Sequence, residues 1–509
     1  MITLDGFSLT LDDFVKVARY KEPVKISSKA KEAVRKSRRV VQHNIEQKNV
    51  VYGINTGFGN LANVRIADSD FNALQRNLVV SHACGTGEPF DSEIVRGMMV
   101  LRVNALIKGY SGIRLEVIDK LVDMLNRDVI PVVYEQGSLG ASGDLVPLAH
   151  MALPLIGEGE VDYDGKTWDS LDAFRKAGIE PLDALQAKEG LALINGTQAM
   201  LSVGALTLYD GFDLYLSSLL SSGLTFEALN GIIDVFDRRI HEARPHKGQS
   251  ITAMLMRRLL EGSKNTRHQG EGKVQDAYSL RCIPQVHGAT LETLLDVLKK
   301  VQVEMNSATD NPLMFVEDEK AISAGNFHGE ILAMYFDYLA IALSEIASIS
   351  ERRLERLVNA GLNHKYPPFL AKYMGRNSGF MIVQYSAASL VSENKALAHP
   401  ASVDSIPSSG NQEDHVSMGS IAARKARKIL SHSRKVVALE MFCAAQALDF
   451  DGKSSLSPVL KAVYESIRKD VPFIEEDTYM KRYMDRIERM LIDHTMHPEK
   501  WEAMLWDAL

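Results

Sequence analysis

The sequence predicts a mostly α-helical protein whose largest part is a bundle of long helices. Apolar residues recur at helical spacing over residues 197–229, 288–308, 326–360 and 415–448, with only short interruptions by glycine, proline or asparagine. Segments of this length would form rods of roughly 30 Å or more. Because such rods must bury their apolar faces against one another, we expect them to pack as a bundle.

The region before these helices is predicted to be mixed. Residues 28–47 form a basic amphipathic pattern that favours a helix, and residues 70–126 have helical spacing that breaks near Gly85–Pro89. The stretch 157–185 is polar and weakly patterned, which predicts short strands. Within it, Val161–Lys166 is typical of the tip of a β-hairpin.

The character of the chain changes after Asn195-Gly196-Thr197. We therefore expect an N-terminal domain over residues 1–196, which carries glycine-rich loops. A central long-helix bundle with a C-terminal helical tail is expected over residues 197–509. The length of 509 residues would also allow more domains, but continuous helical rods favour one large body.

Composition and charge exclude several classes of partner. The net charge of −7 argues against nucleic acid or an anionic membrane as the main partner. Three widely separated cysteines make a disulfide framework unfavourable and favour a reducing compartment. No signal peptide is expected at the N-terminus, and the apolar stretch Leu201–Leu229 is interrupted by Asp210 and Asp213, so it is interpreted as a buried helix. The chain is predicted to be cytoplasmic.

The stretch Gly137–Pro147, GSLGASGDLVP, carries the most distinctive chemistry. An unhindered Gly143 amide nitrogen could attack the Ala141 carbonyl carbon and close a five-membered ring. Loss of one water there, and of the Ser142 hydroxyl as a second water, would leave an electrophilic methylene. On this tripeptide alone a simple glycine-rich turn is the default interpretation. A serine nucleophile elbow, G-x-S-x-G, fails because residue 144 is aspartate.

With Val146-Pro147-Leu148-Ala149-His150, this run resembles the signature of the aromatic amino acid ammonia-lyases, whose cofactor is 4-methylideneimidazol-5-one (MIO). Six further stretches between residue 50 and about residue 420 resemble the family in the same order, so the resemblance covers essentially the whole chain. It is closest to the histidine-specific members, which convert L-histidine to trans-urocanate and ammonia in the first step of histidine degradation.

The resemblance implies a long-helix fold of the fumarase/aspartase-like type. It also implies an MIO group made from Ala141, Ser142 and Gly143, which serve as both catalytic and cofactor residues, and a homotetramer whose active sites combine residues from three subunits. No metal and no diffusible cofactor is required by this interpretation. Whether the amine or the imidazole of the substrate attacks the methylene is left open.

Catalytic residues are carried over from the matching stretches. Tyr52, in YGINTGFG, matches the tyrosine that removes the β-proton; its alternative is a half-buried tyrosine with one hydrogen bond. As a base, its anion would need stabilisation, which helix N-termini aimed at the pocket could provide. Tyr278 is also placed among the catalytic residues. Gln275, Tyr278 and Arg281 would share one face if helical, and Arg281 is assigned to the substrate carboxylate; the alternative is a polar surface stripe.

The substrate-binding residues follow in the same way. Ser81-His82 occupies the selectivity position, and Ser-His is the choice of the histidine-specific members; a metal at His82-Ala83-Cys84 is a weak alternative. Glu413 is the carboxylate that would face the substrate imidazole, whereas acids at the start of a helix over 415–448 would also explain Asp414. The remaining assignments are Phe327, Met381 and Asn195. The resemblance implies that Asn195 hydrogen-bonds near the cofactor and substrate; by local chemistry it would be an N-cap or turn residue before a long helix.

Two rival interpretations stay open. One is a tyrosine or phenylalanine ammonia-lyase or aminomutase of the same family, which Ser81-His82 and Glu413 disfavour, because a carboxylate is badly placed against a benzene ring. The other is a fumarase-like lyase without MIO, and beyond it a helical scaffold without catalysis.

Overall fold

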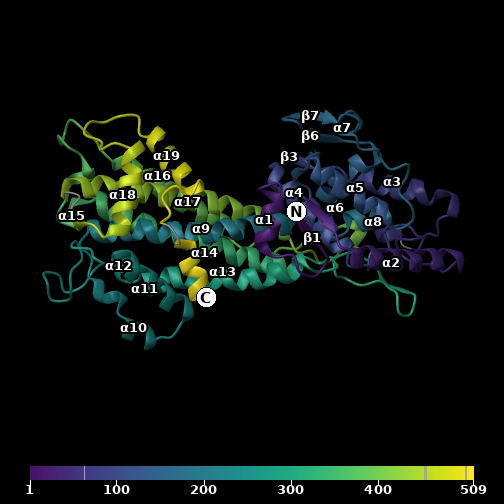
Figure 1. Cartoon of the computed structure of the whole chain (residues 1–509), viewed down its shortest axis with the longest axis horizontal. Helices are drawn as coiled ribbons and strands as arrows, with labels where there is room; N and C mark the ends of the chain where they lie inside the picture. The colour runs from purple at the N-terminus through teal and green to yellow at the C-terminus, as the bar shows by residue number, and fades with distance from the viewer. Residues whose placement is uncertain (62, 452–454, 499–500) are drawn as a thin grey trace. The chain divides into compact units, whose positions relative to one another are not determined.

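The computed structural model describes residues 1–61, 63–451, 455–498 and 501–509, and it is mostly helical, as the sequence predicts (Figure 1). The chain forms two compact units, each assembled from three separate segments. The predicted domain boundary after residue 196 stays a prediction. The first unit consists of Met1–Tyr209, Val297–Asp337 and Pro400–Arg424, and the second of Asp210–Asp296, Tyr338–His399 and Lys425–Leu509.

The first unit combines short helices with small sheets. Helix α2 matches the predicted amphipathic segment to within one residue, and the Ser27 side chain caps it by accepting a hydrogen bond from the Ala30 amide. The helices of this unit are α1 (Leu11–Ala18), α2 (Ser28–Glu46), α3 (Phe71–His82), α4 (Ser92–Leu106), α5 (Leu115–Asn126), α6 (Leu145–Ala152), α7 (Ser170–Ala177) and α8 (Glu189–Ile194).

The strands of the first unit pair locally. The predicted hairpin is present as β6 and β7, antiparallel with Tyr163 opposite Lys166, and β4 extends it to three strands; α7 lies beside it (Figure 1). The other pairs are β1 with β2, β3 with β5 and β8 with β9. The strands are β1 (Ile2–Leu4), β2 (Val24–Ile26), β3 (Thr86–Pro89), β4 (Ile130–Pro131), β5 (Tyr134–Gln136), β6 (Glu160–Tyr163), β7 (Lys166–Asp169), β8 (Leu313–Phe315) and β9 (Lys320–Ile322).

Four long helices account for the predicted rods: α9 (Gln198–Ala228), α13 (Ile283–Met305), α14 (Glu330–Val358) and α17 (Gly419–Asp451). Each coincides with one of the predicted segments, although the ends differ by up to five residues. Helix α9 is buried along most of its length, which confirms the interpretation of Leu201–Leu229 as a buried helix.

Within the second unit, a buried ion pair ties three of these helices together. Glu440 on α17 accepts hydrogen bonds from Thr225 on α9, at 2.7 Å, and from the guanidinium of Arg353 on α14, at 2.6 and 2.8 Å. Both charged side chains are fully buried. Removing either partner would leave an uncompensated buried charge, at a cost of about 3–5 kcal/mol. The remaining helices of this unit are α10 (Arg238–Glu242), α11 (Lys247–Leu260), α12 (Tyr278–Arg281), α15 (Ala360–Asn363), α16 (Met381–Leu397), α18 (Pro458–Asp470), α19 (Lys481–Ile492) and α20 (Trp501–Ala508).

Helix α14 also exposes apolar side chains. Ile331, Met334, Tyr338 and Ile341 are 43–56% exposed and recur every three or four residues, so they form a stripe on one face. Among the described helices only α14 is apolar and long enough to cross a membrane, and 56% of its most apolar window is buried inside the protein. A core helix meets the same criterion, so this finding is weak evidence for a membrane.

Candidate active site

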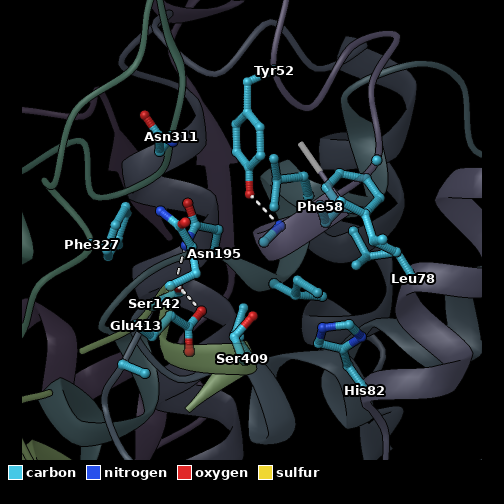
Figure 2. A pocket seen from close by; sticks show the side chains of 18 of the residues that line it. Tyr52, Phe58, Leu78, His82, Ser142, Asn195, Asn311, Phe327, Ser409 and Glu413 are labelled. Atoms are coloured by element: carbon cyan, nitrogen blue, oxygen red, sulfur yellow. Dashed lines mark hydrogen bonds between the residues drawn. The ribbon is translucent and has the colours of Figure 1, made fainter. Parts of the chain in front are cut away.

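A pocket of about 940 Å³ lies in the first unit, where loops and helix ends from distant parts of the chain meet (Figure 2). Its walls come from the loop before α3, from α3 itself, from the glycine-rich run, from the end of α8 and from two later loops. The structure brings seven of the predicted site residues to this pocket: Tyr52, His82, Ala141, Ser142, Asn195, Phe327 and Glu413.

The glycine-rich run forms a tight turn at the floor of the pocket. Gly143 has φ +69°, and a Cβ added there would lie 2.2 Å from the carbonyl oxygen of Gly196, so only glycine fits. Ala141 and Gly143 pair with each other in an isolated bridge, and Gly143 also pairs with Gly196. A bent backbone with an unhindered glycine amide is what closure of a ring onto Ala141 requires. The tripeptide therefore fits the predicted group.

Asp144 holds the turn from behind. Its buried carboxylate accepts hydrogen bonds from the Ser138 hydroxyl at 2.9 Å and from the Met200 amide, at the start of α9, at 2.8 Å. Burial raises the pKa of Asp144 to about 6, because desolvation disfavours its charged form and these hydrogen bonds offset only part of that. The carboxylate thus links the turn to a long helix.

Asn195 contacts the same turn from above. Its side-chain amide donates a hydrogen bond to the Ser142 carbonyl oxygen at 2.7 Å (Figure 2). Asn195 follows the last residue of α8, and two residues separate it from the start of α9; its side chain contacts Ser142 instead of capping a helix. The helix-cap role that local chemistry suggested is thus wrong for the side chain, because a tertiary partner takes its donor.

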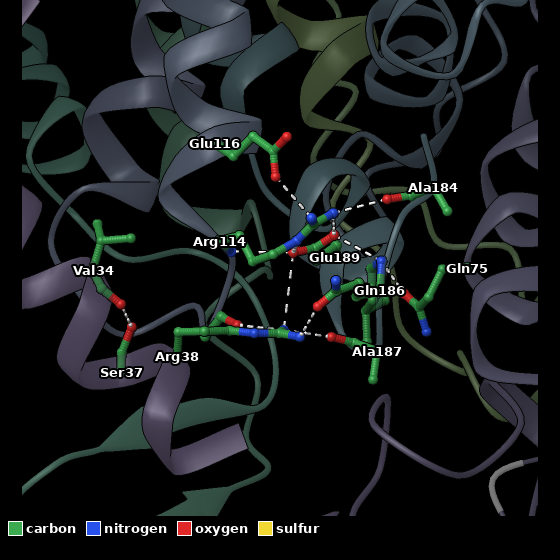
Figure 3. A network of polar contacts seen from close by, with 12 residues as sticks. Val34, Ser37, Arg38, Gln75, Arg114, Glu116, Ala184, Gln186, Ala187 and Glu189 are labelled. Atoms are coloured by element: carbon green, nitrogen blue, oxygen red, sulfur yellow. Dashed lines mark hydrogen bonds and ion pairs between the residues drawn. The ribbon is translucent and has the colours of Figure 1, made fainter. Parts of the chain in front are cut away.

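A buried network fixes the start of α8 (Figure 3). Glu189 is fully buried. Its carboxylate accepts two hydrogen bonds from the Arg114 guanidinium, at 2.7 and 2.9 Å, and one from the backbone N–H of Gln186 at 2.7 Å. Arg38 donates to the backbone carbonyl of Ala187 at 2.8 Å. Because α8 has only six residues, fixing its first turn also fixes Asn195 directly after its last residue.

Arg102 holds Asn195 from the opposite side. One nitrogen, Nη1, donates to the Asn195 carbonyl at 3.0 Å and to the Gln198 side chain at 2.7 Å. The side chain is fully buried, and desolvation lowers its pKa to about 10, so it remains a cation at neutral pH. The Arg102 cation therefore contacts the backbone of Asn195, the residue whose side chain contacts Ser142.

We expect Arg102→Met to disturb the site more than the fold. Loss of a charged donor to Asn195 removes about 1.5–3 kcal/mol of interaction, which would lower kcat about 10- to 100-fold with little change in KM. Steady-state kinetics check this, and thermal melting and intact mass report the fold and the modification of the tripeptide. Arg35→Met, at an exposed position of α2, is the matched control. A fall in melting temperature with unchanged kcat would contradict a positioning role.

Glu413 meets Ser142 across the pocket. The Ser142 hydroxyl donates to Glu413 Oε1 at 2.8 Å (Figure 2). The Ser408 hydroxyl donates to Glu413 Oε2 at 2.9 Å. The following helix, α17, begins only at Gly419. The predicted helix over 415–448 therefore starts too early, and a helix N-terminus does not explain Asp414.

Tyr52 and His82 complete the predicted set. The Tyr52 hydroxyl accepts a hydrogen bond from the Gly59 amide at 3.3 Å, and burial raises the pKa of the phenol, partly offset by this amide. Burial lowers the pKa of His82, so its imidazole is neutral at neutral pH; its Nδ1 lies 3.1 Å from the Ser81 hydroxyl. Helices α6, α9 and α14 begin at or within three residues of residues lining the pocket.

The pocket is acidic. Glu413 and Asp414 line it, and none of its described lining residues is a lysine or an arginine. A substrate carboxylate therefore has no cationic partner among these residues.

Gly143 lies in the turn described above. The other predicted residues, Gln275, Tyr278, Arg281 and Met381, belong to the second unit, and their placement toward this pocket stays a prediction. Arg281 donates to Gln275 at 2.8 Å and stacks over the Tyr278 ring at 4.5 Å, beside a separate pocket of about 770 Å³. The helix there, α12, covers only Tyr278–Arg281, so Gln275 joins the group by contact and not by helical spacing. Met381 begins α16.

Several polar lining residues were not assigned from the sequence, among them Asn311, His328 and His415. Each lies within or beside a stretch that resembles the family, and the two histidines follow Phe327 and Glu413 by one and two residues. That proximity was the available signal. Arg102 gave no such signal, because it contacts Asn195 across 93 positions of sequence.

Comparison with known proteins shows which proteins this chain is similar to. A family model described as aromatic amino acid lyase matches residues 9–469. The histidine ammonia-lyase of Alkaliphilus oremlandii is 56% identical over 94% of this chain and 94% of its own length. The crystal structure of histidine ammonia-lyase from Trypanosoma cruzi has a TM-score of 0.91 at 39% identity and covers 100% of this chain and 95% of that chain. The structure of tyrosine aminomutase from Streptomyces globisporus has a TM-score of 0.94 at 38% identity, with 97% of each chain covered.

Proposed function

We propose that this chain, which belongs to the aromatic amino acid lyase family, eliminates ammonia from L-histidine to give trans-urocanate. The observation that carries the proposal is the carboxylate of Glu413, held 2.8 Å from the Ser142 hydroxyl at the wall of the pocket. A carboxylate is a suitable acceptor for an imidazole N–H, and it would be poorly placed against a phenyl ring. Neutral His82, in the same pocket, is a second polar partner for the imidazole.

The electrophile is proposed to be MIO, formed from Ala141, Ser142 and Gly143, which would act as an electron sink for the departure of ammonia. The chain supplies what that group needs. The amide of Asn195 holds a donor 2.7 Å from the oxygen of residue 142, where it can stabilise negative charge. Loss of the Ser142 hydroxyl would also free Glu413 Oε1 from its present donor, so that this oxygen could accept a substrate N–H.

Tyr52 is proposed to take the β-proton of the substrate. Burial raises the pKa of its phenol, which favours the protonated form, so the base role requires positive potential from the surroundings. The N-termini of α6, α9 and α14 near the pocket are the features that can supply it.

An assay with L-histidine tests the proposed reaction. The purified protein should produce a conjugated product that absorbs in the ultraviolet, one for each ammonia released. Cinnamate or coumarate from phenylalanine or tyrosine, with no product from histidine, would overturn the assignment of Glu413 and favour the family's other substrates. Formation of a β-amino acid without ammonia would favour an aminomutase, the activity named for one structural neighbour.

The active form is proposed to be a homotetramer whose active sites combine residues from different subunits. Two observations support it. The pocket has no lysine or arginine among its described lining residues, although an amino acid substrate carries a carboxylate. The apolar stripe on α14, Ile331 to Ile341, is exposed in the single chain and would be covered by another copy.

Complementation between two inactive variants tests the shared site. Ser142→Ala and Arg281→Met should each be nearly inactive alone. In mixed tetramers, about a quarter of the sites would combine an intact Ser142 from one subunit with an intact Arg281 from another, and activity should return to about that fraction. The mixed species is isolated by two different affinity tags on co-expressed chains. Mixed tetramers that stay inactive would show that both residues of a site come from the same chain.

A further inference from the structure

Two histidines and a glutamate meet at the wall of the pocket. His328 lies in the loop before α14, Glu330 is the first residue of α14, and His415 follows Glu413 by two residues. His328 Nε2 and His415 Nδ1 are 3.3 Å apart, and the imidazole rings are stacked at 24°. One ligand atom from each of the three residues lies within 4.8 Å of the other two.

The separation of the two nitrogens fits a shared cation. Two imidazole nitrogens bound at about 2.0–2.1 Å to a tetrahedral ion lie about 3.3 Å apart. Two imidazoles and one carboxylate are also a preferred ligand set for Zn²⁺ and similar divalent ions, and three protein ligands leave a position for water or another ligand. A small movement of the Glu330 side chain would bring its carboxylate into the same range.

The glutamate supplies a second, independent observation. Glu330 Oε2 is buried and has no hydrogen-bond partner among the described residues. A buried carboxylate oxygen without a partner is costly, and a bound cation would remove that cost. The surroundings favour positive charge as well, since Glu413 and Asp414 line the same pocket and its described lining residues include no lysine or arginine.

The alternative is a simple hydrogen bond between the histidines. The Glu330 amide donates to His328 Nδ1 at 3.3 Å, which leaves the proton on Nε2, facing His415. Both contacts are longer than a typical N–H hydrogen bond of about 2.9–3.0 Å, so little is lost when they are replaced. A cation between the rings would take the place of this proton, and the proton of His328 would move to Nδ1.

We propose that His328, Glu330 and His415 form a binding site for a divalent cation of the Zn²⁺ class. The proposed lyase chemistry requires no metal, so the cation would be bound at the pocket wall and would not serve as a cofactor. Its expected effect on turnover rests on the proposed function. A cation two residues from Glu413 would compete for the amine and imidazole of histidine, and we expect reversible inhibition that a chelator relieves.

Titration of the full-length protein, stripped with a chelator, tests the site without substrate. Isothermal calorimetry with Zn²⁺ should show one site per chain, and Co²⁺ should give visible absorption bands of a nitrogen-ligated, low-coordinate ion. Glu330→Gln and His415→Asn should each weaken binding at least about 10-fold. His364→Asn, at an exposed position, is the matched control and should bind as the unmodified chain does.

Thermal melting without metal shows whether each variant is folded, and the Co²⁺ spectrum of the unmodified chain requires no variant. Absence of a saturable site in the unmodified chain would overturn the proposal. So would Glu330→Gln and His415→Asn variants that bind normally. Binding is measured without histidine, so a failed lyase assay with a normal titration would affect only the proposed function.

Discussion

Replacing Ser142 with alanine should abolish nearly all activity and leave the fold intact. Ser142 is the residue whose hydroxyl would leave as water to form the electrophile, so alanine cannot supply the methylene. The loss should be about 10³-fold or more in kcat, because a group that acts in the chemical step is removed outright. The hydroxyl contacts Glu413 at the pocket wall and packs in no apolar core, so stability should change by less than about 1 kcal/mol.

Intact mass separates the chemistry from other causes of inactivity. The wild-type chain should be two waters lighter than its translated sequence. The Ser142→Ala variant cannot lose the water that comes from the serine hydroxyl, so it should be at most one water lighter than its own translated sequence. Ser69→Ala, at an exposed position, is the matched control and should keep both the mass loss and the activity. A wild-type chain at its full translated mass, or an active Ser142→Ala variant, would favour a lyase without MIO.

Local patterns predicted the elements whose signals are local. Helix α2 was placed to within one residue because Ser27 caps it and its apolar spacing is regular. The hairpin of β6 and β7 was placed because a turn sequence separates two short runs. The last long helix is present as α17, but its predicted start at residue 415 was wrong. Val416 and Met418 pack instead against Ala141, and Met418 adopts a positive φ of 55°. A tertiary contact with the glycine-rich turn overrides the helical spacing there.

The candidate site could be predicted for residues in stretches that resemble the aromatic amino acid ammonia-lyases. Tyr52, His82, Asn195 and Glu413 were assigned from stretches far apart in sequence, and the structure places them at one pocket. The groups that hold them could not be found in this way. Arg102 contacts the backbone of Asn195 across 93 positions of sequence, and Arg114 pairs with Glu189 across 75 positions, so no local pattern marks them.

Glu413→Gln should reduce turnover of histidine far more than it reduces stability. Glutamine has the same shape, and its single oxygen can still accept from the Ser408 hydroxyl, so stability should fall by no more than about 1 kcal/mol. Glutamine lacks the negative charge that would strengthen a hydrogen bond from the substrate imidazole N–H and offset the cost of removing the imidazole from water. We expect kcat/KM for histidine to fall by about 10²- to 10⁴-fold.

The comparison with phenylalanine makes this prediction specific. A neutral amide removes the penalty that a carboxylate imposes on a phenyl ring, so the ratio of kcat/KM for histidine to that for phenylalanine should fall. Asp414→Asn is the matched control, because Asp414 lines the same pocket and should have a much smaller effect. Intact mass must still show the loss of two waters in Glu413→Gln, since a missing ring would mean that Glu413 acts in maturation. Equal turnover of histidine with the ring present would remove Glu413 from substrate recognition, and with it the main reason for choosing histidine over phenylalanine.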